Sequence, residues 1–133
     1  MKSLAAIVLA AGKGTRMKSA LPKVLHHVAG RPMLFYGLSV LKELRIKKTV
    51  VIIGYGAMSV KEAFASEKAV FVEQKKQLGT GHAVACGLKA LKGFSGDVLI
   101  LSGDVPLITK DTLKALKQVK DRKRGSPLAL ITT

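Results

Sequence analysis

Short apolar runs that alternate with helical patterns constrain the fold of this chain more than any other feature of its sequence. The runs lack the in–out alternation of a half-buried strand, which is typical of parallel strands covered on both faces. They lie at residues 5–10, 50–53, 70–72, 98–101 and 128–131. The segments with helical patterns lie at about 32–45, 58–66, 80–91 and 110–122, the first opened by Pro32 in its first turn. This repetition predicts an α/β fold, namely a Rossmann-like, mostly parallel, doubly wound sheet with helices on both faces.

The first apolar run breaks abruptly into a loop that is rich in glycine and positive charge. Its two glycines allow a sharp turn and let bare backbone N–H groups approach an anion. Nearby cations, among them Lys23, add charge at the same place. We therefore predict that this loop holds a polyphosphate. The predicted phosphate-loop residues are Gly12, Lys13, Gly14, Thr15 and Arg16.

Two better-known phosphate loops do not fit this segment. A Walker A loop requires Gly-x-x-x-x-Gly-Lys-Ser/Thr, which the sequence does not contain. The dinucleotide fingerprint requires a third glycine where this chain has Met17. What remains is Gly-x-Gly-Thr-Arg-Met followed by Pro22-Lys23, which resembles the signature of sugar-nucleotide pyrophosphorylases. The resemblance implies an enzyme that joins a nucleoside triphosphate to a sugar 1-phosphate.

Two further segments follow apolar runs and narrow the resemblance. Gln77-Leu-Gly-Thr-Gly-His-Ala83 comes shortly after Gln74, and Ser102-Gly-Asp-Val-Pro-Leu107 follows the most hydrophobic run. Because ligands bind at the carboxyl ends of parallel strands, all three motif segments should meet at one site. Together with residues 21–26 and 28–33, they resemble the uridyltransferase domain of the bacterial bifunctional N-acetylglucosamine-1-phosphate uridyltransferase/glucosamine-1-phosphate acetyltransferases. The resemblance covers residues 4–131 in order and with matching spacing.

The resemblance implies an activity, a cofactor and roles for individual residues. The implied enzyme transfers UMP from UTP to N-acetylglucosamine 1-phosphate, giving pyrophosphate and UDP-N-acetylglucosamine, a precursor of peptidoglycan and lipopolysaccharide. The implied cofactor is Mg²⁺, with Asp104 as a ligand, and the implied catalytic cations are Arg16 and Lys23. Gln74 is expected to hydrogen-bond the uracil edge. The other implied nucleotide-binding residues are Leu9, Ala10, Ala11, Gly12, Lys23, Gly79 and Thr80.

In the family the catalytic domain continues well beyond the length of this chain. The continuation carries a second metal ligand and most of the sugar site. We therefore expect residues 1–133 to form the N-terminal part of a single nucleotidyltransferase domain, truncated at its C-terminus and inactive on its own. The resemblance also allows an oligomer in a full-length protein.

Composition limits the classes of partner. The net charge is +15, but the chain has no tryptophan and no signature of a nucleic-acid-binding motif. On the segment 110–122, an apolar stripe of Leu113, Leu116 and Val119 leaves the lysines on other faces, so a solvated cationic face is expected. No run approaches the ~18 apolar residues of a membrane helix. The single cysteine fits a reducing compartment, and we predict a cytoplasmic protein without a membrane or specific nucleic-acid partner.

Alternatives from two classes stay open. The first is another sugar-phosphate or MobA-like nucleotidyltransferase of this fold, with a different base or acceptor. The cytidylyltransferases of isoprenoid synthesis share the first loop but carry Gln where this chain has Val24, and the MobA-like guanylyltransferases share only the Gly-x-x-x-Arg-Met core. An inactive fragment that binds nucleotides or other polyanions is the remaining alternative. The sequence does not place other potential metal ligands at a suitable spacing from the histidines or the cysteine. Structural roles are therefore expected for His26, His27, His82 and Cys86. His82 is nevertheless close to the predicted uridine pocket.

Overall fold

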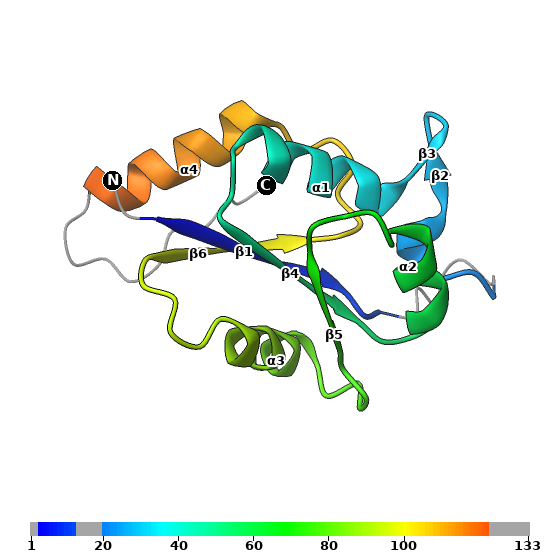
Figure 1. Cartoon of the computed structure of the whole chain (residues 1–133). Helices are drawn as coiled ribbons and strands as arrows, with labels where there is room; N and C mark the ends of the chain where they lie inside the picture. Colours follow the sequence, from blue (N-terminus) through cyan, green and yellow to red (C-terminus); the bar gives the residue numbers. More distant parts are fainter. Residues whose placement is uncertain (1–2, 13–19, 123–133) are drawn as a thin grey trace.

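A parallel sheet forms the centre of the computed structural model, which describes residues 3–12 and 20–122 (Figure 1). Its strands are β1 (Leu4–Ala10), β4 (Lys48–Ile53), β5 (Val70–Glu73) and β6 (Asp97–Ser102). They lie in the order β5-β4-β1-β6, and each neighbouring pair is parallel. The predicted strand at 128–131 lies outside the described residues.

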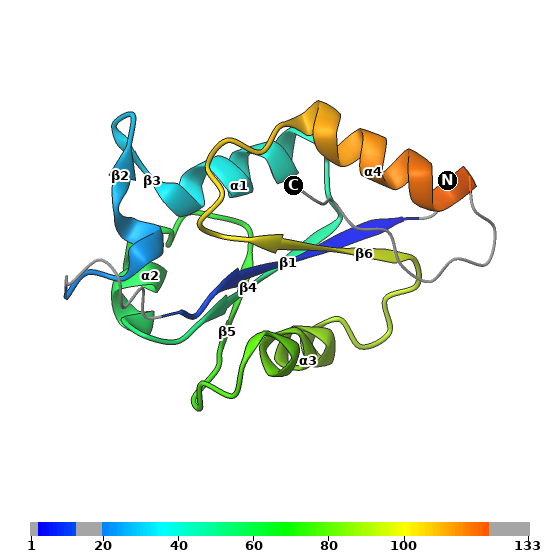
Figure 2. The same cartoon turned by 180° about the vertical axis from the view of Figure 1, so that it is seen from behind.

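Helices cover both faces of the sheet, as predicted. They are α1 (Met33–Glu43), α2 (Ala57–Ala63), α3 (Thr80–Ala90) and α4 (Lys110–Arg122). Figures 1 and 2 show α3 on one side of the sheet and α1 and α4 on the other. All four predicted helices are present, with ends within a few residues of their predicted positions. Pro32 does not lie in the first helical turn as predicted, because it pairs in a short strand and serves as the N-cap of α1.

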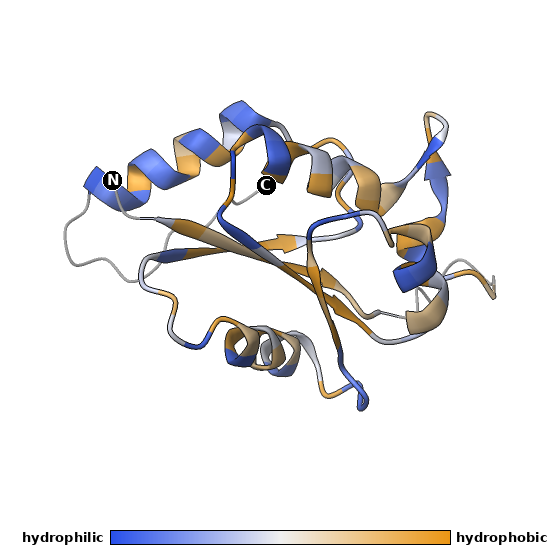
Figure 3. Ribbon diagram, in the orientation of Figure 1, coloured by the Kyte–Doolittle hydropathy of each residue, from blue (hydrophilic) through white to orange (hydrophobic). Residues whose placement is uncertain are grey.

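The two-sided cover explains why the strand sequences lack alternation. Along β1, Ala6 and Val8 pack in a cluster with α1 residues, whereas Ala5 and Ile7 pack in a second cluster with α3 residues. All four are fully buried. Figure 3 shows apolar strands between helices that carry polar residues on their outer faces. A strand buried on both faces needs apolar residues at every position.

A small hairpin between β1 and α1 escaped the sequence analysis. After the 3-10 helix η2 (Lys23–Leu25), strands β2 (His27–Val28) and β3 (Arg31–Pro32) pair antiparallel. Its turn places Ala29 and Gly30 at φ of 50° and 82°, and the Tyr36 hydroxyl of α1 donates a hydrogen bond to the Val28 carbonyl. Two-residue strands are too short for a periodic signal.

The expectation for the outer face of α4 was partly wrong. Leu113 is buried, but Val119 is 50% exposed, so the apolar stripe ends before it. In addition, Lys117 and Lys120 are not simply solvated, because each places its Nζ 3.0 Å from an oxygen of the Asp97 carboxylate at the start of β6. Polar contacts therefore hold the C-terminal half of α4 against the sheet, where the pattern suggested apolar ones.

Candidate active site

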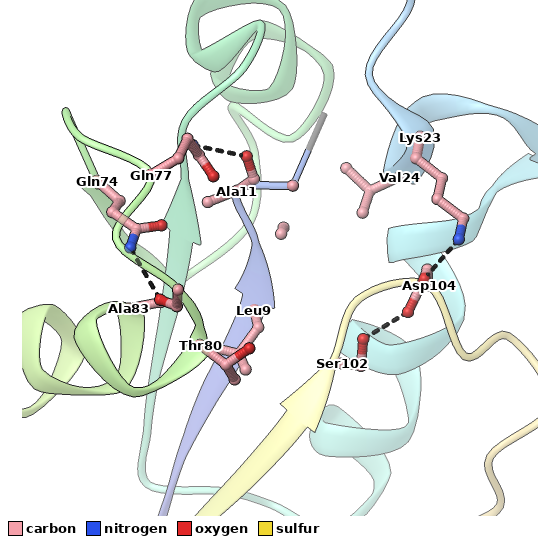
Figure 4. Close-up of a pocket in the computed structure, with 13 residues that line it drawn as sticks. Leu9, Ala11, Lys23, Val24, Gln74, Gln77, Thr80, Ala83, Ser102 and Asp104 are labelled. Atoms are coloured by element: carbon pink, nitrogen blue, oxygen red, sulfur yellow. Dashed lines mark hydrogen bonds and ion pairs between the residues drawn. The ribbon is translucent and has the colours of Figure 1, made fainter. Parts of the chain in front are cut away.

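A cavity of about 440 Å³ opens at the carboxyl ends of the strands (Figure 4). It lies where β1 has β4 on one side and β6 on the other, so chain segments diverge from this point in opposite directions. Such a switch point is the usual ligand crevice of an open α/β sheet. The predicted site residues that line the cavity are Leu9, Ala10, Ala11, Gly12, Lys23, Gln74, Gly79, Thr80 and Asp104. The remaining predicted residues, Lys13, Gly14, Thr15 and Arg16, lie outside the described residues.

A cation and a carboxylate meet on one side of this cavity. Lys23 Nζ lies 2.8 Å from Asp104 Oδ2, and the Ser102 hydroxyl donates a hydrogen bond to the other oxygen of the same carboxylate (Figure 4). The hydrogen bond from Lys23, followed by that from Ser102, holds the pKa of Asp104 below its ordinary value. Both side chains of the ion pair are about one-third exposed, at 39% and 33%, and so remain open to a ligand. Asp104 is therefore a charged oxygen donor at neutral pH.

The position of Lys23 follows from its short helix. In η2 the side chains of Val24 and Leu25 are buried, which leaves Lys23 to face the cavity. The preceding residue, Pro22, packs on Gly56, where an added Cβ would lie 2.2 Å from Pro22 Cγ. Gly56 also has a φ of 67°, which other residues rarely adopt. Close packing on the start of α2 thus fixes the segment that carries Lys23.

On the opposite side of the cavity, Gln74 is buried at the end of β5, with only 3% of its surface exposed. Its backbone N–H extends the sheet by donating to the Ile53 carbonyl over 2.7 Å. Its side-chain Nε2 lies 3.2 Å from the Gly79 carbonyl and 2.9 Å from His82 Nδ1. The side-chain amide is therefore held in one position, as is required of a group that recognises a ligand by a directional hydrogen bond.

Gln77 is a site residue that the sequence analysis missed. Its Nε2 donates a hydrogen bond of 3.0 Å to the Ala11 carbonyl, which joins the loop after β5 to the end of β1. Gly54 leaves room for this bond, since a Cβ there would lie 2.5 Å from Gln77 Nε2. Val24, Ala83 and Ser102 also line the cavity without having been predicted. For Gln77, Ala83 and Ser102 the available signal was their place in the motif segments.

The described residues fit a metal ion that arrives with a phosphate ligand better than a preformed protein cage. Within residues 3–12 and 20–122, no group of three or more His, Cys, Asp or Glu could hold a metal ion. Asp104 is an oxygen donor at the cavity, and Mg²⁺ commonly takes one or two carboxylates together with substrate phosphates and water. Among the described residues, the His82 ring has hydrogen-bond contacts with Gln74 and, over 3.9 Å, with the Cys86 sulfur, which is not the geometry of a metal site. None of the helices in the described ranges is long and apolar enough to cross a membrane.

Comparison with known proteins gives the family. A family model described as "MobA-like NTP transferase domain" matches residues 6–131. The bifunctional protein GlmU of Geotalea daltonii is 47% identical over 133 residues, which cover 99% of this chain and 29% of that protein. The GlmU of Trichlorobacter lovleyi is 52% identical over 113 residues, which cover 84% of this chain and 25% of that protein. The chain thus matches about a quarter to a third of the length of these curated relatives.

Solved structures share the fold at low sequence identity. Rv0371c from Mycobacterium tuberculosis aligns with a TM-score of 0.75 and 23% identity, covering 91% of this chain and 62% of that chain. The 4-diphosphocytidyl-2C-methyl-D-erythritol synthase from Anaerococcus prevotii gives 0.72 and 23%, covering 90% and 51%. Rv0371c has also been solved in complex with manganese. Since its family match spans nearly its whole length, this chain belongs to the MobA-like NTP transferase domain family.

Proposed function

We propose that the chain provides the nucleotide-binding part of a uridylyltransferase site. The proposed reaction transfers UMP from UTP to N-acetylglucosamine 1-phosphate and releases pyrophosphate. The observation that carries the proposal is the meeting of Gln74, Lys23 and Asp104 in one cavity at the switch point of the sheet. The extensive identity to GlmU proteins supports a sugar-phosphate acceptor over other acceptors.

The chemistry requires positioning and charge stabilisation, with no covalent nucleophile on the protein. A phosphate oxygen of the sugar phosphate attacks the α-phosphorus of UTP in line, and the bond to pyrophosphate breaks. Negative charge on the transferring group is stabilised by Lys23 and, in our proposal, by Arg16 of the phosphate loop. Preorganised charges of this kind typically contribute ~3 kcal/mol each to the transition state. The backbone of Ala11 and Gly12 supports the nucleotide from the end of β1.

We propose Mg²⁺ as the cofactor, with Asp104 as its ligand from this chain. The bound ion would neutralise charge on the phosphates. The low pKa of Asp104 favours this role, because the carboxylate is ionised without the metal. The Lys23 ammonium at 2.8 Å holds the carboxylate in place at the mouth of the cavity until the metal and nucleotide enter. The manganese complex of Rv0371c supports a divalent ion in a protein of this fold.

We further propose that residues 1–133 are the N-terminal part of a nucleotidyltransferase domain whose acceptor side comes from elsewhere in a longer protein. The chain's coverage of 29% of a GlmU relative supports this arrangement. A chain of this kind should bind nucleotide without turning it over. Measurable pyrophosphate release by the isolated 133-residue chain would contradict this part of the proposal.

Titration of the chain with UTP, CTP, GTP and ATP in the presence of Mg²⁺ tests the function. We expect UTP to bind more tightly than the other three, and Gln74→Ala to reduce this preference more than it reduces affinity for inorganic tripolyphosphate. Preferential GTP binding would favour a MobA-like guanylyltransferase instead. Equal and strongly salt-dependent binding of all four would indicate a polyanion-binding surface.

A further inference from the structure

The side-chain amide of Gln74 has a fixed orientation. A backbone carbonyl can only accept a hydrogen bond, so the amide group that lies 3.2 Å from the Gly79 carbonyl must be the nitrogen. The same carbonyl also accepts the Ala83 N–H over 3.1 Å at the start of α3. Two lone pairs allow both bonds. The first amide hydrogen of Gln74 is therefore committed to the protein.

The second amide hydrogen is committed to His82. Gln74 Nε2 lies 2.9 Å from His82 Nδ1, so this ring nitrogen must carry a lone pair and the ring proton must sit on Nε2. His82 Nε2 faces the Cys86 sulfur at 3.9 Å, one helical turn further along α3. With both hydrogens used, the Gln74 amide has no donor left for a ligand.

What remains for a ligand is the amide oxygen. It accepts no hydrogen bond from the part of the chain that the structure describes. Figure 4 shows this oxygen on the side of the amide that faces the middle of the cavity, with the nitrogen turned toward α3. The cavity therefore presents a hydrogen-bond acceptor at this point and no donor.

We infer that His82 is a positioning residue for nucleobase selection, an inference that rests on the proposed uridylyltransferase function. The neutral imidazole holds the Gln74 amide so that its oxygen accepts the ring N3–H of uracil. Cytosine has a lone pair at N3, so the same oxygen would repel it. Without His82 the Gly79 carbonyl alone holds the amide nitrogen. The amide can then turn over at the loss of one hydrogen bond instead of two and offer N–H, which would satisfy cytosine.

Two substitutions at His82 separate positioning from a general effect on structure. His82→Leu removes the acceptor for the second amide hydrogen, whereas His82→Asn keeps one, because its side-chain oxygen can take the place of Nδ1. We expect His82→Leu to lower the ratio of UTP to CTP affinity about tenfold, the effect of one unmade hydrogen bond. His82→Asn should retain most of the ratio. Cys86→Ala, which changes the other partner of the ring, should leave the ratio unchanged.

The affinities are measured by NMR titration of the full chain with Mg²⁺, which reaches weak binding, and inorganic tripolyphosphate serves as the probe without a base. Its affinity should be the same in all four proteins. If the original chain does not prefer UTP to CTP, the proposed function fails and the inference fails with it. If the original chain prefers UTP and His82→Leu keeps that preference, only the inference is overturned.

A second measurement needs no nucleotide. Nitrogen-15 spectra of the free chain should show His82 protonated at Nε2, with a scalar coupling between Nδ1 and the Gln74 side-chain nitrogen across the hydrogen bond. Protonation at Nδ1 with a bare Nε2 would overturn the inference, because Nδ1 would then be a donor and could not hold the amide nitrogen.

Discussion

Gly87 of α3 packs directly on Ile7 of β1 and Ile52 of β4, so Gly87→Ala should destabilise the fold. An added Cβ would lie 2.9 Å from both Ile7 Cδ1 and Ile7 Cγ2, and 3.2 Å from Ile52 Cδ1. Both isoleucines are fully buried, and the Cγ2 methyl is attached to the stiff branched Cβ, so it cannot move without the side chain. The helix itself must shift.

The magnitude follows from two opposing terms. Overpacking a well-filled core typically costs ~1–3 kcal/mol of unfolding free energy. Replacing glycine by alanine inside a helix returns up to ~1 kcal/mol. We therefore expect a net loss of about 1 kcal/mol. The same shift moves Ala83, a wall of the cavity one turn earlier, and so should weaken nucleotide binding as well.

Gly81 offers a matched control in the same helix. A Cβ at Gly81 meets no atom within 4 Å, so Gly81→Ala gains helix propensity without a clash. Both variants gain helix propensity, Gly81 in the first turn less than Gly87 in the interior, so the difference between their unfolding free energies is a lower bound on the packing cost of ~1–3 kcal/mol. Urea unfolding followed by circular dichroism measures it. Equal stability of the two variants would refute the close packing of α3 on β1 and β4.

Three further predictions concern the site and the anchoring of α4. Asp104→Asn should raise the Mg²⁺ concentration needed for UTP binding without unfolding the domain, since the amide keeps the shape but loses the charge that the ion needs. An unchanged Mg²⁺ dependence in isothermal titration would remove Asp104 from the metal site. Gln77→Ala should weaken UTP binding severalfold, because it leaves the Ala11 carbonyl with the Tyr55 N–H at 3.3 Å but without the side-chain bond, whereas alanine at the exposed Gln118 of α4 should not. Equal affinities would show that the 3.0 Å bond does not shape the site. Hydrogen bonds from Lys120 and then Lys117 lower the pKa of the Asp97 carboxylate. The ionised carboxylate therefore stabilises the fold fully at a pH above its unfolded pKa of ~4, and this stabilisation is lost as the pH falls through its folded pKa. Asp97→Asn should therefore cost stability at neutral pH and progressively less in acid, and a cost that is the same at ~pH 7 and ~pH 3 in thermal melts would contradict this account.

Much of the fold was predictable from sequence because its signals are local. The uninterrupted apolar run of β1 identified a strand covered on both faces, and Ala5 to Val8 are buried against helices on opposite sides. Lys110–Arg122 was predicted as a helix with the observed bounds. Parallel strands also predicted where the motif segments meet, since their carboxyl ends share one edge of the sheet. The described members of the predicted site line one cavity there.

Only the tertiary structure decided which side chains pair. Lys23 meets Asp104, and Gln77 reaches the Ala11 carbonyl across 66 positions of sequence. These contacts depend on the strand order β5-β4-β1-β6. The periodicity of residues within one segment carries no information about that order. The same reason explains the error at α4. Its helical pattern predicted solvent-exposed lysines, but Lys117 and Lys120 form ion pairs with Asp97 of β6. A local pattern determines which residues are buried in a strand or helix, whereas a polar side chain takes its partner from whatever chain segment the fold brings beside it.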